Sequence, residues 1–197
     1  MALEVDLNAN VDEYFREVVE SAAEQASVES SEYGLTYVSA LLSSYARPLA
    51  RERALLGESL TLALHSAATE KALARRIERL RTVGDAVLYA TGFFEEHLAA
   101  RGVSLPYVRG LGARAYDLAA SAFVTSSELF AELATRFDDY ARVLRAASDA
   151  IAATSAGGGP TGTLLLYERW MKTRSPAAAD ALIERGLLPT TTKNTLH

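Results

Sequence analysis

The chain has 197 residues, of which 25 are acidic, 20 are basic and none is cysteine, and its formal net charge is -5. A chain of this length corresponds to one domain with at most short appended segments. The absence of cysteine excludes disulfides, thiol catalysis and cysteine-ligated zinc or iron–sulfur centres. The acidic balance gives no reason to expect nucleic acid or an anionic membrane as a partner.

Two helices are predicted at the start of the chain. The first is expected to be capped by Asn8 or Asn10, with apolar residues on one side over 14–26. The second is expected to begin at the serines at 30–31, because Ser is a favoured residue at a helix start. Its helical spacing continues until Pro48, which cannot continue a helix.

The middle of the chain predicts a long helix. A charged turn or short helix over 50–56 and a helix over 58–68 come first. Apolar residues over 69–100 then alternate spacings of three and four, which is typical of a single long helix. Gly84 and Gly92 each cost about 1 kcal/mol relative to alanine in a helix, so one of them is expected to mark a close crossing or a bend.

The next two elements are also predicted to be helical. Gly102 ends the long helix, and Pro106 fits the first turn of a helix that runs to Ala122. A capped start at Thr125 begins a second long helix over 125–151, again with alternating apolar spacings of three and four.

Glycines divide the chain near its end. A Gly-rich loop over 155–162 separates a helical body, 1–154, from a C-terminal segment, 163–197. The C-terminal segment contains two short predicted helices, 164–172 and 175–185, and a polar tail, and we expect it to dock on the body. No segment alternates as a strand does, so the predicted fold class is all-α: a single-domain helical bundle of about seven or eight helices around two long central helices.

The chain shows no signal for secretion or membrane anchoring. Its first residues have no basic region followed by a long apolar stretch, as a signal peptide would. No uncharged apolar run approaches the length of about 18 residues that a transmembrane helix needs. We therefore expect a cytoplasmic protein without a transmembrane anchor.

Catalytic motifs are also missing. Gly157 and Gly162 have the spacing of a phosphate-binding loop, but Thr163 stands where that motif requires lysine, and a helix precedes it where the motif needs a buried strand. There is no nucleophile elbow of the Gly-x-Ser-x-Gly kind. An enzyme whose acid and base come from residues far apart in the sequence remains an open alternative, but we favour a protein that is not an enzyme.

The three histidines do not form a metal-binding pattern. His65, His97 and His197 are not part of the Glu-x-x-His pairs that build di-metal sites in helical bundles. His65 is expected to be a core-edge histidine rather than a haem or metal ligand, and His97 a cation near a helix end. No metal site and no cofactor are predicted.

One helix face combines opposite charges with a phenol. Arg81, Asp85 and Tyr89 are four residues apart and so share a face. Either Arg81 forms an ordinary ion pair with Asp85, which is the more common situation, or these residues line a polar pocket together with Tyr116. The second reading predicts a ligand site.

Charge is unevenly distributed along the sequence. Residues 1–32 contain nine acids and one arginine, whereas residues 47–81 contain eight bases and four acids. The two segments are complementary, so they are expected to meet within one chain or between two chains, unless both are simply solvated faces. Arg75, Arg76 and Arg79 are the basic residues we assign to partner binding.

A second candidate for partner binding lies after the Gly-rich loop. Tyr167 and Trp170 fall on a short amphipathic segment, and both residue types are common among interface hot spots. The alternative, which we favour, is that these two side chains dock on the rest of the protein.

Together these features lead to two functional hypotheses. The first is a protein–protein interaction module, that is, a scaffold, adaptor or regulatory subunit that self-associates as a homo-oligomer or binds a protein partner. The alternative is a helical bundle that binds a small ligand in a pocket between helices.

Overall fold

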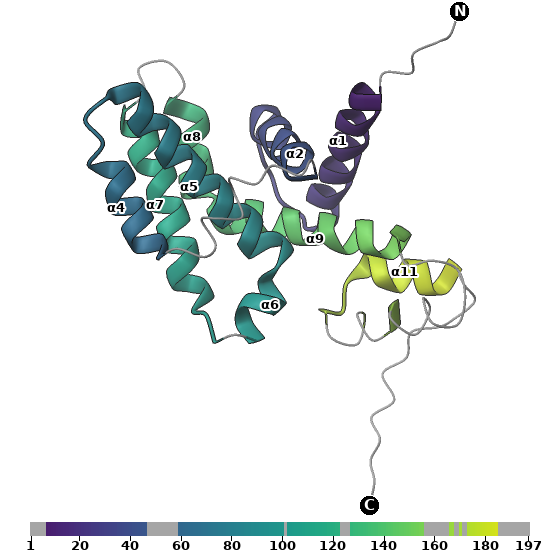
Figure 1. The fold of residues 1–197 in the computed structure, drawn as a ribbon. Coiled ribbons are helices and arrows are strands. Elements are labelled where there is room, and N and C mark those ends of the chain that lie inside the picture. The colour runs from purple at the N-terminus through teal and green to yellow at the C-terminus, as the bar shows by residue number, and fades with distance from the viewer. Residues whose placement is uncertain are drawn as a thin grey trace, which may run out of the picture. The chain divides into compact units, whose positions relative to one another are not determined.

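The computed structural model describes residues 7–46, 59–100, 102–122, 127–155, 166, 167, 170 and 173–184. All regular elements in these residues are helices, which confirms the predicted all-α helical bundle (Figure 1). They are α1 (Leu7–Gln25), α2 (Glu32–Ala46), α4 (Leu60–Ala68), α5 (Leu73–Phe93), α6 (Glu95–Ala100), α7 (Leu105–Ala122), α8 (Ser127–Thr135), α9 (Phe137–Ser155) and α11 (Pro176–Glu184).

The chain divides into two compact units, Met1–Arg145 and Ala146–His197. The division falls inside α9, before the Gly-rich loop at which we expected the body to end. In the first unit α5 packs against α4 and α7, α7 packs against α8, and α1 packs against α2. In the second unit a small apolar core is formed by Ala153, Leu166, Trp170, Ala178 and Leu182.

Helix α1 begins earlier than predicted, whereas α2 begins where predicted. Since α1 starts at Leu7, neither Asn8 nor Asn10 caps it. Before α2, the Ser31 hydroxyl accepts a hydrogen bond from the Gly34 amide at 3.0 Å, which satisfies one of the free N–H groups at the helix start.

The prediction of a single long helix over 69–100 is wrong. Thr69 ends α4, α5 begins only at Leu73, and Phe94 separates α5 from α6. At Phe94 the backbone leaves the helical region, with φ of -121° and ψ of 25°. Apolar spacing continues through this residue, so periodicity alone does not reveal the break.

The second predicted long helix is also divided. Arg136 separates α8 from α9, and Asp138 and Asp139 occupy the first turn of α9. Acidic side chains are favourable at a helix N-terminus, and the Arg136 Nε also donates a hydrogen bond to Asp139 at 3.1 Å. The Asp-Asp pair was therefore a start signal that the apolar pattern concealed.

Both glycines of α5 lie at close crossings, whereas a crossing or a bend was predicted at one of them. A Cβ atom added to Gly84 would lie 2.6 Å from the Tyr116 ring of α7. A Cβ added to Gly92 would lie 2.5 Å from the Leu144 Cβ of α9. The absence of side chains at these positions lets the helix backbones approach each other closely.

Two further predictions concern the ends of helices. Gly102 follows α6 with a φ of +73°, a conformation that favours glycine, and so ends the helical run as predicted. Pro106 is the second residue of α7 and lies in its first turn, also as predicted. Residues 47–58 and 156–165, where we expect a short charged segment and the Gly-rich loop, lie outside the described residues.

Candidate functional site

The basic residues assigned to partner binding lie on the first turns of α5. Arg75 and Arg79 are exposed and Arg76 is half-buried, with exposed Lys71 just before the helix. Arg79 approaches Glu70 at 3.6 Å, whereas Arg75 and Arg76 form no ion pair within the described part of the chain. We call Lys71, Arg75, Arg76 and Arg79 the basic face.

Acidic side chains cover the outer side of α1. Val19, Ala22 and Ala23 are buried, and the acidic residues between and around them are exposed. The exposed acids Glu13, Glu17, Glu20 and Glu24 are called the acidic face below. Their side chains therefore remain available to a partner along the whole helix.

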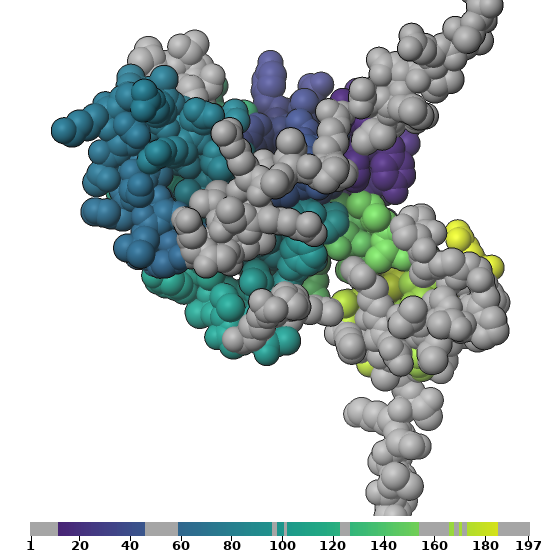
Figure 2. All heavy atoms as spheres, in the orientation of Figure 1, coloured from purple at the N-terminus to yellow at the C-terminus, as the bar shows by residue number. Residues whose placement is uncertain are grey.

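The two faces belong to helices with different neighbours. The packing partner of α1 is α2, and those of α5 are α4 and α7. In the space-filling view, α1 (purple) and α4 with the start of α5 (blue) both reach the surface of the molecule (Figure 2). Of the described residues, no ion pair joins the acidic face to the basic face. The contact within one chain that we considered is not seen between the described residues, and residues 47–58 of the basic segment lie outside them. Contact between two chains and two simply solvated faces both stay open.

Asp85 is the centre of a hydrogen-bonded cluster. Its Oδ1 accepts hydrogen bonds from the hydroxyls of Tyr37 at 2.6 Å and Tyr116 at 2.7 Å, which come from α2 and α7. Its Oδ2 lies 3.8 Å from the Arg81 Nε, and the Asp85 side chain is 15% exposed. Burial, and then the negative charge of Asp85, raise the pKa of both tyrosines well above their ordinary value.

Only three of the four residues predicted for the ligand site come together. Arg81, Asp85 and Tyr116 are in contact, whereas the Tyr89 ring stacks on Tyr45 at a centroid distance of 4.1 Å and on Phe93 at 5.1 Å. Because the protein's own tyrosines donate to Asp85, this cluster joins α2, α5 and α7. The contacts of Asp85 thus give the cluster a structural role, the joining of these three helices.

The participation of Tyr37 in this cluster was not predicted. Tyr37 and Asp85 are 48 residues apart, and no local spacing rule relates them. Only the placement of α2 against α5 brings the hydroxyl to the carboxylate.

A second carboxylate cluster was also missed. Glu132 of α8 accepts hydrogen bonds from the Ser31 amide at 3.0 Å, the Ser31 hydroxyl at 2.6 Å and the Tyr140 hydroxyl at 2.5 Å. Burial favours a higher pKa for Glu132, but these hydrogen bonds outweigh it and hold the pKa below its ordinary value. The cluster ties the start of α2 to α8 and α9.

The lowered pKa of Glu132 predicts a pH-dependent contribution to stability. Because the folded-state pKa lies below that of the unfolded chain, the contribution is complete above the ordinary value of 4.5 and is lost as the pH falls through the folded-state pKa. The difference in free energy of unfolding between the wild type and Glu132→Gln should be constant near neutral pH and shrink in acid. Urea unfolding at several pH values measures it, and a difference that grows on acidification would contradict the assignment.

The aromatic residues of the second unit are packed inside it. Trp170 is 7% exposed and belongs to the apolar core of that unit, and Tyr167 packs against the same core. The Arg174 guanidinium lies 4.6 Å from the centre of the Trp170 ring, a cation–π contact. A partner could reach Trp170 only if this unit opened.

The described residues contain neither a metal-binding cluster nor a membrane-spanning helix. No cluster of His, Asp and Glu there could hold a metal ion, and His65 is exposed on α4. The side chains of His97 and His197 lie outside the described part. None of the described helices has the length and apolar composition to cross a membrane.

Comparisons of the chain with protein-family models, curated proteins and solved structures found no match.

Proposed function

We propose that the chain is a cytoplasmic protein–protein interaction module that binds further copies of itself, the acidic face of one copy against the basic face of the next. The observation that supports this most is the exposure of two oppositely charged helix faces whose helices pack against different neighbours. Complementary charged surfaces steer association and fix the orientation of partners.

The two faces are different surfaces, so the contact is head-to-tail. Such contacts generate rings when the rotation between copies closes and open filaments when it does not. Exposed apolar side chains occur on the same helices or next to them: Leu73 at the start of α5, Leu62 on α4 and Tyr14 on α1. Desolvation of these side chains would add affinity to the charge attraction.

Reversal of two charges on the basic face tests the proposal. Arg75→Glu/Arg79→Glu should weaken self-association by about tenfold or more, because the basic face then has no net charge and its attraction for the acidic face is lost. Sedimentation velocity over a concentration series measures the change. Association should also weaken as salt is added, because salt screens charges at an exposed contact.

A matched control exists on other helices. Arg114 and Arg142 have side chains that are 60% and 55% exposed, close to the 54% of Arg79. Arg114→Glu/Arg142→Glu changes the net charge by the same amount away from both faces. Equal loss of association in the two variants would count against the basic face.

A further inference from the structure

The turn between α1 and α2 is strained at Ser27. This residue has a φ of 50°, in the left-handed region that favours glycine. The Ser27 amide donates to the Glu24 carbonyl at 3.0 Å. The next amide, that of Val28, donates to the Ala23 carbonyl at 3.0 Å. These two hydrogen bonds form a Schellman motif, which requires a left-handed residue where this chain has a serine.

The same turn contains a buried hydroxyl without a partner. The Ser30 hydroxyl is buried and makes no hydrogen bond with the described residues. Buried hydroxyls are nearly always hydrogen-bonded, so this group also disfavours the closed turn. Residues 26–31 contain neither glycine nor proline, the residues that most strongly specify a tight turn. Opening of the turn would release Ser27 from the left-handed region and give the Ser30 hydroxyl access to water.

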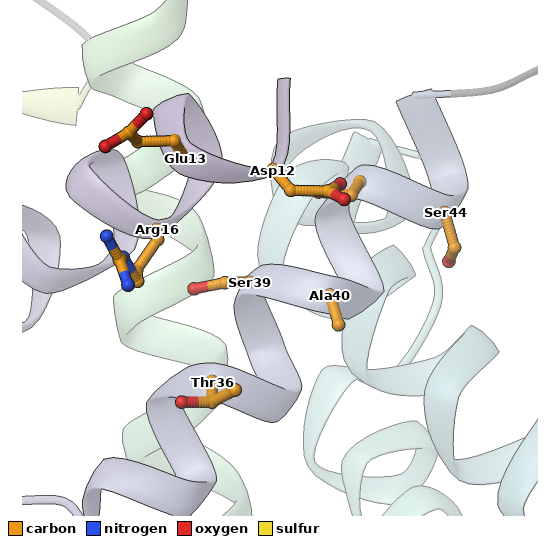
Figure 3. Close-up of a pocket in the computed structure, with 8 residues that line it drawn as sticks. Asp12, Glu13, Arg16, Thr36, Ser39, Ala40 and Ser44 are labelled. Carbon is orange, nitrogen blue, oxygen red and sulfur yellow. The ribbon is translucent and has the colours of Figure 1, made fainter. Parts of the chain in front are cut away.

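The contact of α1 with α2 relies on small side chains. Helix α1 packs against α2, and its described buried residues, Val19, Ala22 and Ala23, all lie in its second half. Nearer its start, Glu13 and Arg16 line an open groove whose other side is formed by small residues of α2 (Figure 3). Separation of α1 from α2 therefore exposes mainly small apolar side chains of α1.

The start of α2 is fixed more firmly than the turn before it. Ser31 donates hydrogen bonds from its amide and its hydroxyl to Glu132 of α8. Tyr37 donates to Asp85 of α5. Helix α2 is thus tied to α5 and α8 when the turn opens, and the side of α2 that α1 covered becomes free. The α1 of a second copy has the shape and chemistry that this side fits.

We propose that two copies of the chain exchange α1, so that the α1 of each copy packs against the α2 of the other. The exchanged dimer keeps the contacts between α1 and α2 and changes only the turn, and short hinges under strain favour such exchange. The proposal does not rest on the contact between the charged faces. Those faces lie on the outer side of α1 and on α5, and exchange alters neither of them.

Exchange is tested in the Arg75→Glu/Arg79→Glu background, which removes association through the charged faces. Because α1 must leave α2 first, exchange is slow, so concentrated protein is held in urea below its unfolding midpoint and the urea is then removed. Sedimentation velocity should show a dimer that untreated protein lacks. The dimer should persist on dilution, since its separation requires the same opening of the turn.

NMR on a mixture of differently labelled copies identifies the contact in this dimer. After the urea treatment, inter-chain NOEs should connect the methyl groups of Val19 with methyl groups of α2. Val19 is fully buried, so a contact between the charged faces brings no atom of a second chain to it. Such NOEs therefore distinguish exchange from the proposed head-to-tail contact.

Variants of the turn should change the dimerisation constant in opposite directions. Ser27→Gly removes the strain of the closed turn and should lower the constant about tenfold, whereas Ser27→Val, branched at Cβ, should raise it about tenfold. Ser30→Ala removes the unpaired hydroxyl from the closed turn and should also lower the constant. Glu29→Gln, a change at an exposed side chain of the same turn, should dimerise like the background.

Three results would overturn the inference. These are a background protein that stays monomeric after the urea treatment, a dimer without inter-chain NOEs from α1 to α2, and a dimerisation constant that both Ser27→Gly and Ser30→Ala leave unchanged. All three are measured without the intact basic face. A wild type that fails to associate through its charged faces would therefore contradict the proposed function and not this inference.

Discussion

Replacing Asp85 with leucine is expected to lower the free energy of unfolding by about 3 kcal/mol. The substitution removes the acceptor shared by the hydroxyls of Tyr37 and Tyr116. Tyr116 is fully buried, so water cannot replace the lost hydrogen bond at its hydroxyl. A buried polar group without a partner costs about 1–3 kcal/mol, and two groups are affected here. Urea denaturation measures the loss.

Removal of the tyrosine hydroxyls should restore much of this stability. In Asp85→Leu/Tyr37→Phe/Tyr116→Phe both hydroxyls that donate to Asp85 are removed with their acceptor, and apolar groups of similar shape replace these three side chains. The triple variant should therefore be more stable than Asp85→Leu alone. A triple variant that is less stable would show that the hydroxyls have other important partners.

Asp117 provides the matched control for this position. It is an aspartate on α7 whose side chain is 52% exposed and which pairs with Arg114, three residues away on the same helix. Exposed pairs of this kind contribute little, so Asp117→Leu should change stability by less than about 1 kcal/mol. Similar losses at Asp85 and Asp117 would argue against a structural role for the Asp85 cluster.

Substitution of Gly92 by alanine is expected to destabilise the protein by about 2 kcal/mol, although alanine is the better helix former. The added Cβ would lie 2.5 Å from the Leu144 Cβ and 3.3 Å from the Ala141 carbonyl oxygen. Neither atom is at the end of a flexible side chain, so the crossing of α5 and α9 must open. Overpacking of this kind outweighs the gain in helix propensity.

Gly110 in α7 supplies the control with the opposite sign. A Cβ added there meets nothing within 4 Å. Gly110→Ala should therefore stabilise the protein by about 0.5–1 kcal/mol through helix propensity alone. Thermal or urea unfolding of both variants compares the two effects, and changes of the same sign would contradict the close crossing at Gly92.

The local sequence pattern predicted the presence of the helices better than the residues at which they begin and end. Helical periodicity and the positions of Gly102 and Pro106 indicated the all-α fold class and most of the helices. These signals act within one or two turns of a helix, so they can be recognised in the sequence alone. The breaks at Phe94 and Arg136 were missed because apolar spacing continues through both residues.

Of the residues around Asp85, Arg81 was predicted from spacing along one helix, Tyr116 of another helix was named with it, and Tyr37 was missed. Arg81 and Asp85 are four residues apart and do face each other. Tyr37 on Asp85 and Ser31 on Glu132 are contacts between distant segments, 48 and 101 residues apart. Such contacts depend on which helices pack together, and the periodicity of a single helix does not contain that information.

The most direct test of self-association through the two charged faces is a mixing experiment by sedimentation velocity. One variant carries Arg75→Glu/Arg79→Glu and the other carries Glu17→Arg/Glu20→Arg. Each should remain monomeric alone, because the substitutions leave its altered face with two acidic and two basic residues and so without a net charge that attracts the other face. An equimolar mixture should associate again, because the intact acidic face of the first variant meets the intact basic face of the second. Wild-type protein that remains monomeric at every concentration, or a mixture that fails to associate when the wild type does, would contradict the account.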